Sequence, residues 1–387
     1  MKPFIYDMNF VREQSAKKLF TAVSTFAGGG GSSTGYRLAG GDVLAMSEFI
    51  PAAQETYRAN YPDTPIFPQD IRELTAEEIL NKIGLKKGEL DILDGSPPCS
   101  SFSIAGKKEE MWGQIKKYSD TEQRTDDLFF EFTRILNGLQ PKVFICENVA
   151  GLTSGASKDL LGSDQFNMFG GEEDTIYHSL VNCGYNVRYK VINAKNYGVP
   201  QNRERTIFIG VRKDLKADIT YPKPLNEIVS LGEALNDIEC IEATIKAFGE
   251  KEPRRVQKNG VCFTVLADGL GVQRRYKVVR HGVNASHKDR NDETKLFADS
   301  SKDVSPTILS QYKGLANGLV EVEFDNSEKA LRKLSIPELK VISSFPSDYI
   351  LTGTYSKQWE RIGRAVPPLM MKAIAEHVWE TILKPNK

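Results

Sequence analysis

The sequence has little that would place it in a membrane or outside the cell. No run approaches the roughly eighteen apolar residues of a membrane span, and the first ten residues, MKPFIYDMNF, lack the basic-then-apolar order of a secretory signal. Five cysteines are scattered without the paired spacing typical of zinc ligands: Cys99, Cys146, Cys183, Cys240 and Cys262. An odd number of cysteines without a disulfide framework is typical of a reducing compartment. We therefore expect a cytoplasmic protein with no membrane partner and no metal.

The chain also lacks an overall charge of one sign. Lys plus Arg and Asp plus Glu both number 51, so a nucleic-acid partner has to be argued from local charge. Residues 251–295 carry eleven basic and five acidic side chains. This local excess fits either a solvated surface loop or a surface that contacts phosphates. With 387 residues, 40% hydrophobic and 26% charged, the chain is long enough for one large domain with an inserted module, or for two ordinary domains.

Short apolar runs alternate with helical stretches through the first half of the chain. We expect strands at residues 20–26, 42–49, 91–93, 142–146 and 206–211. Thr75 with Glu78 three residues later forms a capping box that predicts a helix start, and Gly84 stands where that helix would end. An apolar helix is expected at residues 368–383. Strands alternating with helices predict an open, mostly parallel α/β sheet, in which ligands bind outside the carboxyl ends of the strands.

A glycine-rich stretch follows the first expected strand. Gly28 and Gly30 belong to a run of four glycines that would let the backbone approach a ligand closely before a helix begins. Glu48 ends the second expected strand, twenty residues after Gly28, where its carboxylate could accept hydrogen bonds from a ribose. No Gly-Lys-Ser/Thr sequence follows the glycines, so a nucleotide-triphosphate loop is disfavoured.

A second group of residues suggests covalent chemistry. Pro97 and Pro98 fix the backbone immediately before Cys99, which makes this thiol a candidate nucleophile on a strand-end loop. Glu147 brings a carboxyl group to the same sheet edge after the strand at residues 142–146. Arg203 and Arg205 are two residues apart, so on one strand they would point the same way, brace one another and grip one face of a ligand.

In this order the motifs resemble the cytosine-5 DNA methyltransferases, from about residue 20 to the C-terminus and interrupted mainly over residues 226–330. The matching segments are Phe26-Ala27-Gly28-x-Gly30, Pro97-Pro98-Cys99-x-x-Phe102-Ser103, Glu147-Asn148-Val149, Gln201-x-Arg203-x-Arg205, residues 331–334 with Glu338 and Phe345-Pro346, and residues 358–368. One departure is Arg364, where the family usually carries Asn.

The resemblance implies a doubly wound, mostly parallel α/β sheet of the Rossmann-like methyltransferase type with a smaller inserted target-recognition domain. Residues 1–225 plus 350–387 would form the catalytic domain that binds S-adenosylmethionine. Residues 226–349 would form the target-recognition domain, whose basic, motif-poor part would contact double-stranded DNA.

By the same resemblance, Cys99 would add to carbon 6 of a cytosine that has been flipped out of the duplex, and a methyl group would pass to carbon 5. Glu147 would hold the N3/N4 edge of the base, while Arg205, supported by Arg203, would bind O2. Residues 104–125 would close over the base. The cofactor contacts implied are Phe26, Ala27, Gly28, Gly30, Glu48, Phe49, Asp70, Ile71, Pro97, Leu128, Ala365 and Val366, with Phe49 stacked on adenine.

Three alternatives differ in substrate or class. The same chemistry could act on tRNA, because one branch of the family does so and Cys262-Phe263-Thr264 is similar to a tripeptide of that branch. A DNA-binding protein on a methyltransferase scaffold would be expected to lose its catalytic residues, all of which are present. A nucleotide-dependent oxidoreductase would leave the Pro-Pro-Cys segment unexplained. We expect a bacterial or phage enzyme, acting as a monomer, with a restriction endonuclease as a possible partner.

Overall fold

The structure is a computed structural model of the 387-residue chain. It describes residues 3–98, 116–118, 121–123, 125, 127–149, 176–235, 240–241, 273–274, 276–282, 297–308, 319–324 and 329–387. The expected nucleophile Cys99 lies outside these residues, as do most of the expected closing loop at 104–125, most of the basic segment at 251–295, and Cys262.

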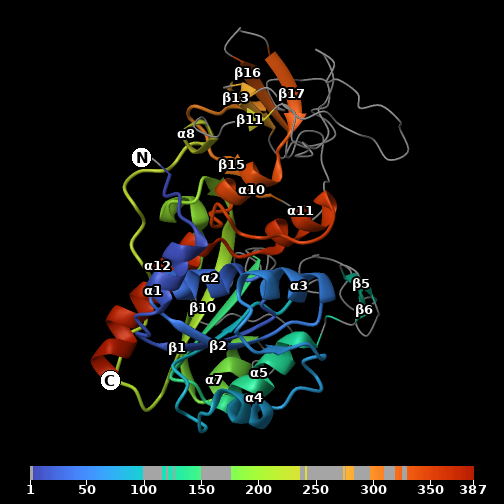
Figure 1. The fold of residues 1–387 in the computed structure, drawn as a ribbon. Helices are drawn as coiled ribbons and strands as arrows, with labels where there is room; N and C mark the ends of the chain where they lie inside the picture. Colours follow the sequence, from blue (N-terminus) through green and yellow to red (C-terminus); the bar gives the residue numbers. More distant parts are fainter. Residues whose placement is uncertain are drawn as a thin grey trace, which may run out of the picture. The chain divides into compact units, whose positions relative to one another are not determined.

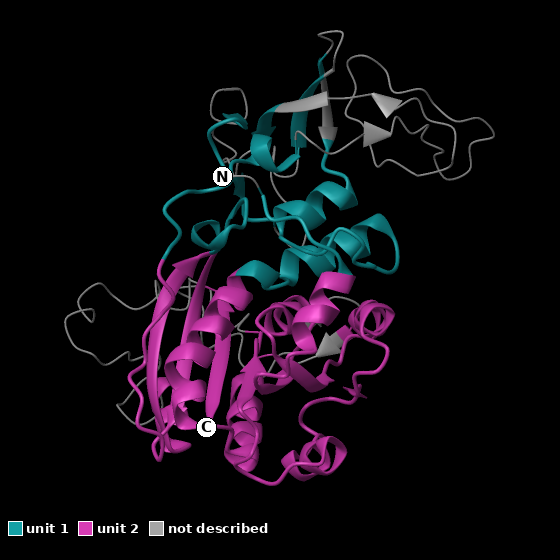
Figure 2. Cartoon of the chain, turned by 60° about the vertical axis from the view of Figure 1, so that its left-hand side comes forward, with its two compact units in different colours: residues 1–8, 194–203, 224–369 teal, residues 9–193, 204–223, 370–387 magenta. Residues whose placement is uncertain are grey.

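The chain divides into two compact units (Figure 2). The larger unit comprises residues 9–193, 204–223 and 370–387, and the smaller unit comprises residues 1–8, 194–203 and 224–369. Compactness therefore assigns residues 194–203 and 350–369 to the smaller unit. The functional division into residues 1–225 plus 350–387 and residues 226–349 stays a prediction.

The larger unit is built on a seven-stranded sheet of described strands (Figure 1). Its strands are β1 (Thr21–Thr25), β2 (Asp42–Ser47), β3 (Ile66–Phe67), β4 (Ile92–Gly95), β7 (Val143–Val149), β8 (Tyr185–Asn193) and β10 (Glu204–Arg212). The order is β3-β2-β1-β4-β7-β10-β8. Pairs from β3 to β7 are parallel, whereas β10 runs antiparallel to both β7 and β8. The predicted mostly parallel α/β sheet is confirmed.

Helices follow the strands in the alternation that the sequence predicts. They are α1 (Met8–Ser15), α2 (Gly31–Leu38), α3 (Pro51–Asn60), α4 (Ala76–Ile83), α5 (Leu128–Leu139), α7 (Ile176–Asn182) and α12 (Pro368–Val378), which continues as a π-helical turn over Trp379–Leu383 and a 3-10 turn over Lys384–Asn386. The capping box of α4 is present, with the Glu78 backbone N–H donating to the Thr75 hydroxyl at 3.2 Å. Gly84 ends α4 at φ 71°, as expected. Residues 116–118 and 121–123 form the antiparallel pair β5 and β6.

The main apolar core lies between the sheet and the helices α4, α5 and α7 (Figure 1). Phe132 of α5 packs edge-to-face on Phe144 of β7, which packs in the same way on Tyr185 of β8. Gly95 is required at this contact, because a Cβ there would lie 2.4 Å from the Phe132 ring. The opposite face of β4 is polar, since Asp94 accepts hydrogen bonds from Ser24 of β1 and Tyr36 of α2.

The smaller unit contains an antiparallel sheet in the order β14-β13-β16-β17. Its elements are β9 (Gln201–Asn202), β11 (Cys240–Ile241), β12 (Gln273–Arg274), β13 (Tyr276–Gly282), β14 (Phe297–Asp299), β15 (Ser305–Pro306), β16 (Leu319–Phe324), β17 (Lys329–Lys333), α8 (Leu231–Leu235), α10 (Ile336–Ile342), α11 (Tyr355–Arg364) and the 3-10 turn Ala194–Tyr197. Ser335 and Glu338 form a capping box at the start of α10. No helix among the described residues is long and apolar enough to cross a membrane.

Candidate active site

The carboxyl ends of β1 and β4 lie side by side at the point where the strand order reverses. This switch point is where open α/β sheets bind ligands. The backbone after β1 adopts left-handed conformations, with φ 53° at Phe26, 54° at Gly28 and 93° at Gly30, the residue that caps α2. A non-glycine residue such as Phe26 is strained there. A Cβ on Gly28 would meet no atom within 4 Å, so this part of the loop is open.

Glu48 fixes the glycine loop to the end of β2. One carboxylate oxygen accepts the Gly28 backbone N–H at 2.7 Å, and the other accepts the Ile50 N–H at 2.7 Å. The side chain of Gln54 donates to the Glu48 carbonyl, also at 2.7 Å. Glu48 is only 8% exposed, and both its oxygens keep lone pairs that could accept hydroxyl groups. Phe49, beside it, is half-buried.

The other expected cofactor residues of the larger unit follow β1, β3 or β4 in the chain or begin α5. Ala27 is buried and donates its N–H to the Ser47 carbonyl, at the end of β2. Ile71 and Leu128 belong to the apolar core, and Asp70 binds the neighbouring Arg72 through its carboxylate. These groups supply an acidic acceptor, open backbone and apolar surface, a set that fits a nucleoside-containing cofactor.

Glu147 and Arg205 form an ion pair at the junction of β7 and β10. The Arg205 Nε lies 2.7 Å from Glu147 Oε1, and both side chains are largely buried. Glu147 pairs in register with Ile207, so Arg205 lies two residues earlier on β10 and on the same face. The structure thus brings Glu147 and Arg205 together on one face of the sheet. Because this ion pair is largely shielded from water, its electrostatic interaction with a bound polar group would be strong.

A further contact connects this pair to the expected nucleophile loop. The Asn148 side-chain amide donates to the Pro97 carbonyl at 3.3 Å, and Pro97 is buried. This hydrogen bond joins Asn148, the residue after Glu147, to Pro97, which is two positions before Cys99.

Arg203 does not share a strand with Arg205, and the prediction that the two brace one another from one strand is wrong. The β10 ladder begins at Glu204, while the Arg203 N–H donates to the Gln201 carbonyl and its own carbonyl accepts from Ala194. Arg203 as a whole is 2% exposed. It donates to the carbonyls of Ile308 at 3.4 Å and Gly363 at 3.0 Å, both in the smaller unit. The two arginines therefore have different partners: Arg203 donates to backbone carbonyls, whereas Arg205 pairs with Glu147.

The last motif lies at the end of α11 in the smaller unit. Arg364, where the family usually has Asn, donates to Glu360 at 2.9 Å. Arg361 also lies 3.3 Å from Glu360, so Arg364 is part of a charged cluster on this helix. Ala365 caps α11 by donating its N–H to the Arg361 and Ile362 carbonyls, and Val366 is buried.

Sequence reasoning did not single out Asp94, a buried acid on the polar face of β4. Its carboxylate accepts from the Ser24 hydroxyl at 2.6 Å and from the Tyr36 hydroxyl at 3.0 Å. Burial raises the pKa of Asp94 to about 7, and the nearby Glu147 adds to this, although the two hydrogen bonds oppose it. The available signal was an acid after Ile92 and Leu93 in an otherwise apolar strand.

Part of the basic segment is neutralised within the smaller unit. Arg280 of β13 pairs with both carboxylate oxygens of Glu321 on β16, at 2.9 and 3.0 Å. It also lies 5.4 Å from the centre of the Phe297 ring.

Among the described residues, no group of His, Cys, Asp and Glu could hold a metal ion.

The fold has close counterparts among solved structures. A structure of a DNA modification methyltransferase encoded within an E. coli prophage has a TM-score of 0.61 at 19% identity. The match covers 95% of this chain and all of that one. At this identity the comparison shows the fold alone, which is that of the cytosine-5 methyltransferases.

Sequence comparisons identify the family. The C-5 cytosine-specific DNA methylase model matches residues 20–380. The type II methyltransferase M1.HphI of Haemophilus parahaemolyticus is 33% identical over 92% of this chain and 86% of its own length. The type II methyltransferase M.DdeI of Desulfomicrobium norvegicum is 28% identical over 92% of this chain and 88% of its own. The chain therefore belongs to the C-5 cytosine-specific DNA methylase family, and its activity is DNA cytosine-5 methylation. It needs a methyl donor and acts on DNA.

Proposed function

We propose that Cys99, Glu147 and Arg205 carry out cytosine-5 methylation at the carboxyl edge of the larger unit's sheet. The observation that supports this most strongly is the buried Glu147–Arg205 pair, combined with the bond from Asn148 to Pro97. Together they hold an acid and a cation next to the segment that leads into Cys99.

Covalent addition by Cys99 explains why a thiol is needed. Carbon 5 of cytosine is a poor nucleophile because the ring is aromatic and electron-poor. A thiolate that adds to carbon 6 removes the aromaticity and makes carbon 5 enamine-like. Once carbon 5 is methylated, loss of its proton and elimination of the thiolate restore the aromatic ring and free the enzyme.

Glu147 and Arg205 would respond to the charge that this addition creates. A Glu147 carboxyl at the N3/N4 edge favours a proton on N3, which withdraws electrons from the ring as the thiolate adds. Arg205 would stabilise negative charge at O2. The two groups satisfy one another at 2.7 Å, so a bound base would share them or replace one partner.

Arg203 would support Arg205 from the chain that leads into β10. Its buried guanidinium fixes the carbonyls of Ile308 and Gly363 within the smaller unit. Arg203 thus orients the backbone two residues before Arg205, rather than touching the base.

The methyl donor that fits the described residues is S-adenosylmethionine. When bound, it supplies an electrophilic methyl group on a sulfonium. Glu48 would accept the ribose hydroxyls, and the open backbone at Gly28 would admit the amino-acid part. Phe49, Ile71 and Leu128 would enclose the adenine, with Asp70 accepting from its amino group. Phe26, Ala27, Pro97, Ala365 and Val366 complete the proposed set.

Double-stranded DNA would be read by residues 226–349, with the basic residues of 251–295 contacting phosphates. The target base would be flipped at a cost of a few kcal/mol, and residues 104–125 would then close over it. Replacing residues 226–330 with the matching segment of a relative should change the methylated sequence and preserve cofactor affinity. An active chimera with its original specificity would contradict this domain assignment.

Bisulfite sequencing of DNA from cells that express the protein tests the function and reveals the recognised sequence. Methylated cytosines should appear in one sequence context with the natural protein and in none with Cys99→Ala. Methyl transfer to duplex DNA should exceed transfer to tRNA under matched conditions, and the reverse order would favour the tRNA alternative.

We propose that the enzyme acts as a monomer in the cytoplasm of a bacterium, encoded by the host or a phage, with a cognate restriction endonuclease as its partner system.

A further inference from the structure

The segment from Asp70 to Leu74 connects β3 to α4 as a tight turn. The Glu73 N–H donates to the Asp70 carbonyl at 2.9 Å, and the Leu74 N–H donates to the Ile71 carbonyl at 3.2 Å. The Arg72 N–H donates to one oxygen of the Asp70 carboxylate at 3.0 Å. This turn carries two of the residues that we assign to the adenine end of the cofactor site.

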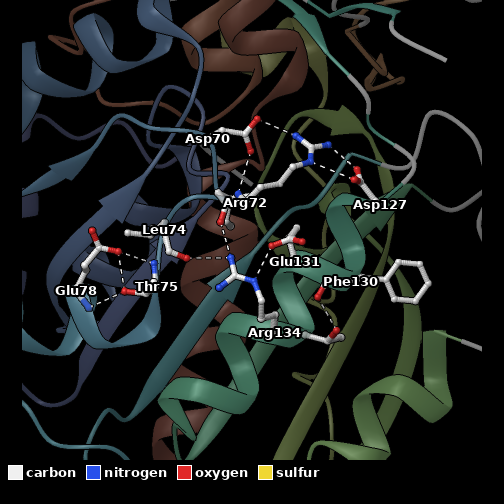
Figure 3. Close-up of polar contacts among 11 residues, drawn as sticks. Asp70, Arg72, Leu74, Thr75, Glu78, Asp127, Phe130, Glu131 and Arg134 are labelled. Carbon is white, nitrogen blue, oxygen red and sulfur yellow. Dashed lines mark hydrogen bonds and ion pairs between the residues drawn. The ribbon is translucent and has the colours of Figure 1, made fainter. Parts of the chain in front are cut away.

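Arg72 joins this turn to the start of α5 (Figure 3). Its guanidinium lies 2.8 Å from Asp70 through Nη1. It binds both oxygens of Asp127, at 3.1 Å through Nε and 2.5 Å through Nη2. Asp127 directly precedes Leu128, so one guanidinium holds two segments that are 55 residues apart in the chain. Each of those segments supplies a proposed adenine contact.

Arg134 fastens the same turn from the middle of α5. One of its nitrogens donates to the carbonyls of Ile71 at 2.6 Å and Leu74 at 2.9 Å. Glu131, one turn earlier on the helix, orients the guanidinium through Nε at 2.7 Å. Figure 3 shows Arg72 extending from the turn toward Asp127, and Arg134 extending from α5 toward the turn.

The far end of the turn is fixed independently. Thr75 and Glu78 close the capping box of α4 directly after Leu74. The backbone from Asp70 to Thr75 therefore has little freedom except at Asp70 itself, whose carboxylate position depends on Arg72.

We propose that Arg72, assisted by Arg134, is a positioning residue that sets the geometry of the adenine end of the cofactor site. It does so by holding the Asp70 carboxylate and the Leu128 turn of α5 at a fixed separation. This inference rests on the proposed cofactor site. A planar guanidinium that binds two carboxylates is needed for this role, because a lysine ammonium cannot chelate Asp127 and reach Asp70 in the same geometry.

The test compares two arginines of the same unit with similar partners. Arg72→Lys keeps the positive charge and loses the bidentate contact of the guanidinium with Asp127. Arg212→Lys is the control, because Arg212 also chelates one aspartate, Asp214, while its other partners are the Gly88 and Gln140 carbonyls. Arg212 lies at the end of β10 that pairs beside Val143, the amino end of β7. The dissociation constant of S-adenosylmethionine is measured by calorimetry for each full-length variant. The unfolding midpoint without cofactor, and kcat and KM, are measured alongside.

Arg72→Lys should raise the dissociation constant and the cofactor KM roughly three- to tenfold. Its kcat at saturating cofactor should stay within about twofold, because the reacting atoms lie elsewhere. Asp127→Asn should give a similar loss, and the double variant should lose less than the product of the two. Arg134→Ala should weaken cofactor binding in the same direction. Arg212→Lys should leave the dissociation constant unchanged.

An unchanged dissociation constant in Arg72→Lys would overturn the inference, as would an equal rise in Arg212→Lys. Glu48→Gln separates this failure from failure of the proposed site. If Glu48→Gln weakens S-adenosylmethionine binding and Arg72→Lys does not, the positioning role alone is wrong. If Glu48→Gln also leaves binding unchanged, the cofactor site itself is wrong.

Discussion

The central sheet has one edge at the amino ends of its parallel strands and another at their carboxyl ends, and strand β10 extends from one to the other. The polar side chains at these two edges have different partners. At the amino edge of the parallel strands, charged side chains form hydrogen bonds with backbone N–H and C=O groups. Asp91 accepts the Thr21 N–H at 2.9 Å and the Lys142 ammonium at 2.8 Å. Arg212, at the same edge, donates to the Gly88 and Gln140 carbonyls.

The carboxyl edge carries a strained residue and a largely buried ion pair. Phe26 adopts a left-handed backbone conformation that non-glycine residues avoid, and the charged pair of Glu147 and Arg205 is largely buried. Burial of such a pair contributes little to stability by itself, because the desolvation of both ions opposes their attraction. Backbone strain occurs at both edges, because Lys18 and Gln140, which precede β1 and β7, also have positive φ values. The largely buried Glu147–Arg205 ion pair is what distinguishes the edge where the chemistry is proposed.

The largest expected effect is at the carboxyl edge. Glu147→Gln should lower the methylation rate about 10²- to 10⁴-fold, because its carboxyl favours the proton on N3 during the addition. Affinity for duplex DNA should change far less, since the interaction strengthens mainly in the transition state. Single-turnover methylation and fluorescence-based duplex binding measure the two quantities. The exposed Glu204 on β10 provides the control, and Glu204→Gln should change neither. Equal losses of rate and DNA affinity would remove Glu147 from the chemistry.

A smaller effect is expected at Asp94, which lies beneath the carboxyl edge. Its pKa of about 7 in the folded state is above the ordinary 3.8 of the unfolded chain. The folded state thus binds this proton more tightly, and the stability that it confers is lost as the pH rises through about 7. Relative to Asp94→Asn, the natural protein should lose about 2–3 kcal/mol of unfolding free energy between pH 5 and 8.

Urea unfolding of both proteins at several pH values measures this difference. The other ionisable groups that act on Asp94 are Tyr36 and Glu147, and both are kept in Asp94→Asn. Parallel pH dependences for the two proteins would show that Asp94 does not titrate in this range.

The smallest effect is expected at the amino edge. Arg212→Met removes two hydrogen bonds to carbonyls and the pair with Asp214, so the unfolding free energy should fall by about 1–2 kcal/mol. The methylation rate of the folded enzyme should stay within about twofold of the natural rate, because no part of the proposed site touches this edge. Denaturant unfolding measures the free energy, and initial rates at saturating substrates measure the methylation activity. A rate loss as large as that of Glu147→Gln would erase the distinction between the two edges.

Local sequence signals predicted much of the larger unit. Thr75, Glu78 and Gly84 defined both ends of α4 because capping depends only on residues within one turn. Apolar runs gave the central strands, since strands buried on both faces are nearly all apolar. The strand at residues 142–146 predicted that Glu147 reaches a sheet edge, whereas its ion pair with Arg205 came only from the structure.

Contacts set by tertiary structure could not be predicted in this way. Arg203 and Arg205 have the spacing of neighbours on one strand face, but the β10 ladder begins only at Glu204, between them. The role of Arg72 depends on Asp127, which is far away in the sequence and carries no motif. Arg280 lies in the basic segment, whose charge fits a solvated loop or a phosphate contact, whereas its partner Glu321 comes from a neighbouring strand of the smaller sheet.

The central claim is that Cys99 adds covalently to the target cytosine, and a duplex with 5-fluorocytosine at the methylated position tests it most directly. The thiolate should add to carbon 6 and the methyl group should transfer. Fluorine cannot leave carbon 5 as a proton does, so elimination is blocked. Enzyme and DNA should then migrate together in a denaturing gel only when S-adenosylmethionine is present, and peptide mapping should place the link on Cys99. Cys99→Ala should abolish the link while still binding cofactor. A link through Cys146 or Cys262, or normal methylation by Cys99→Ala, would contradict the mechanism.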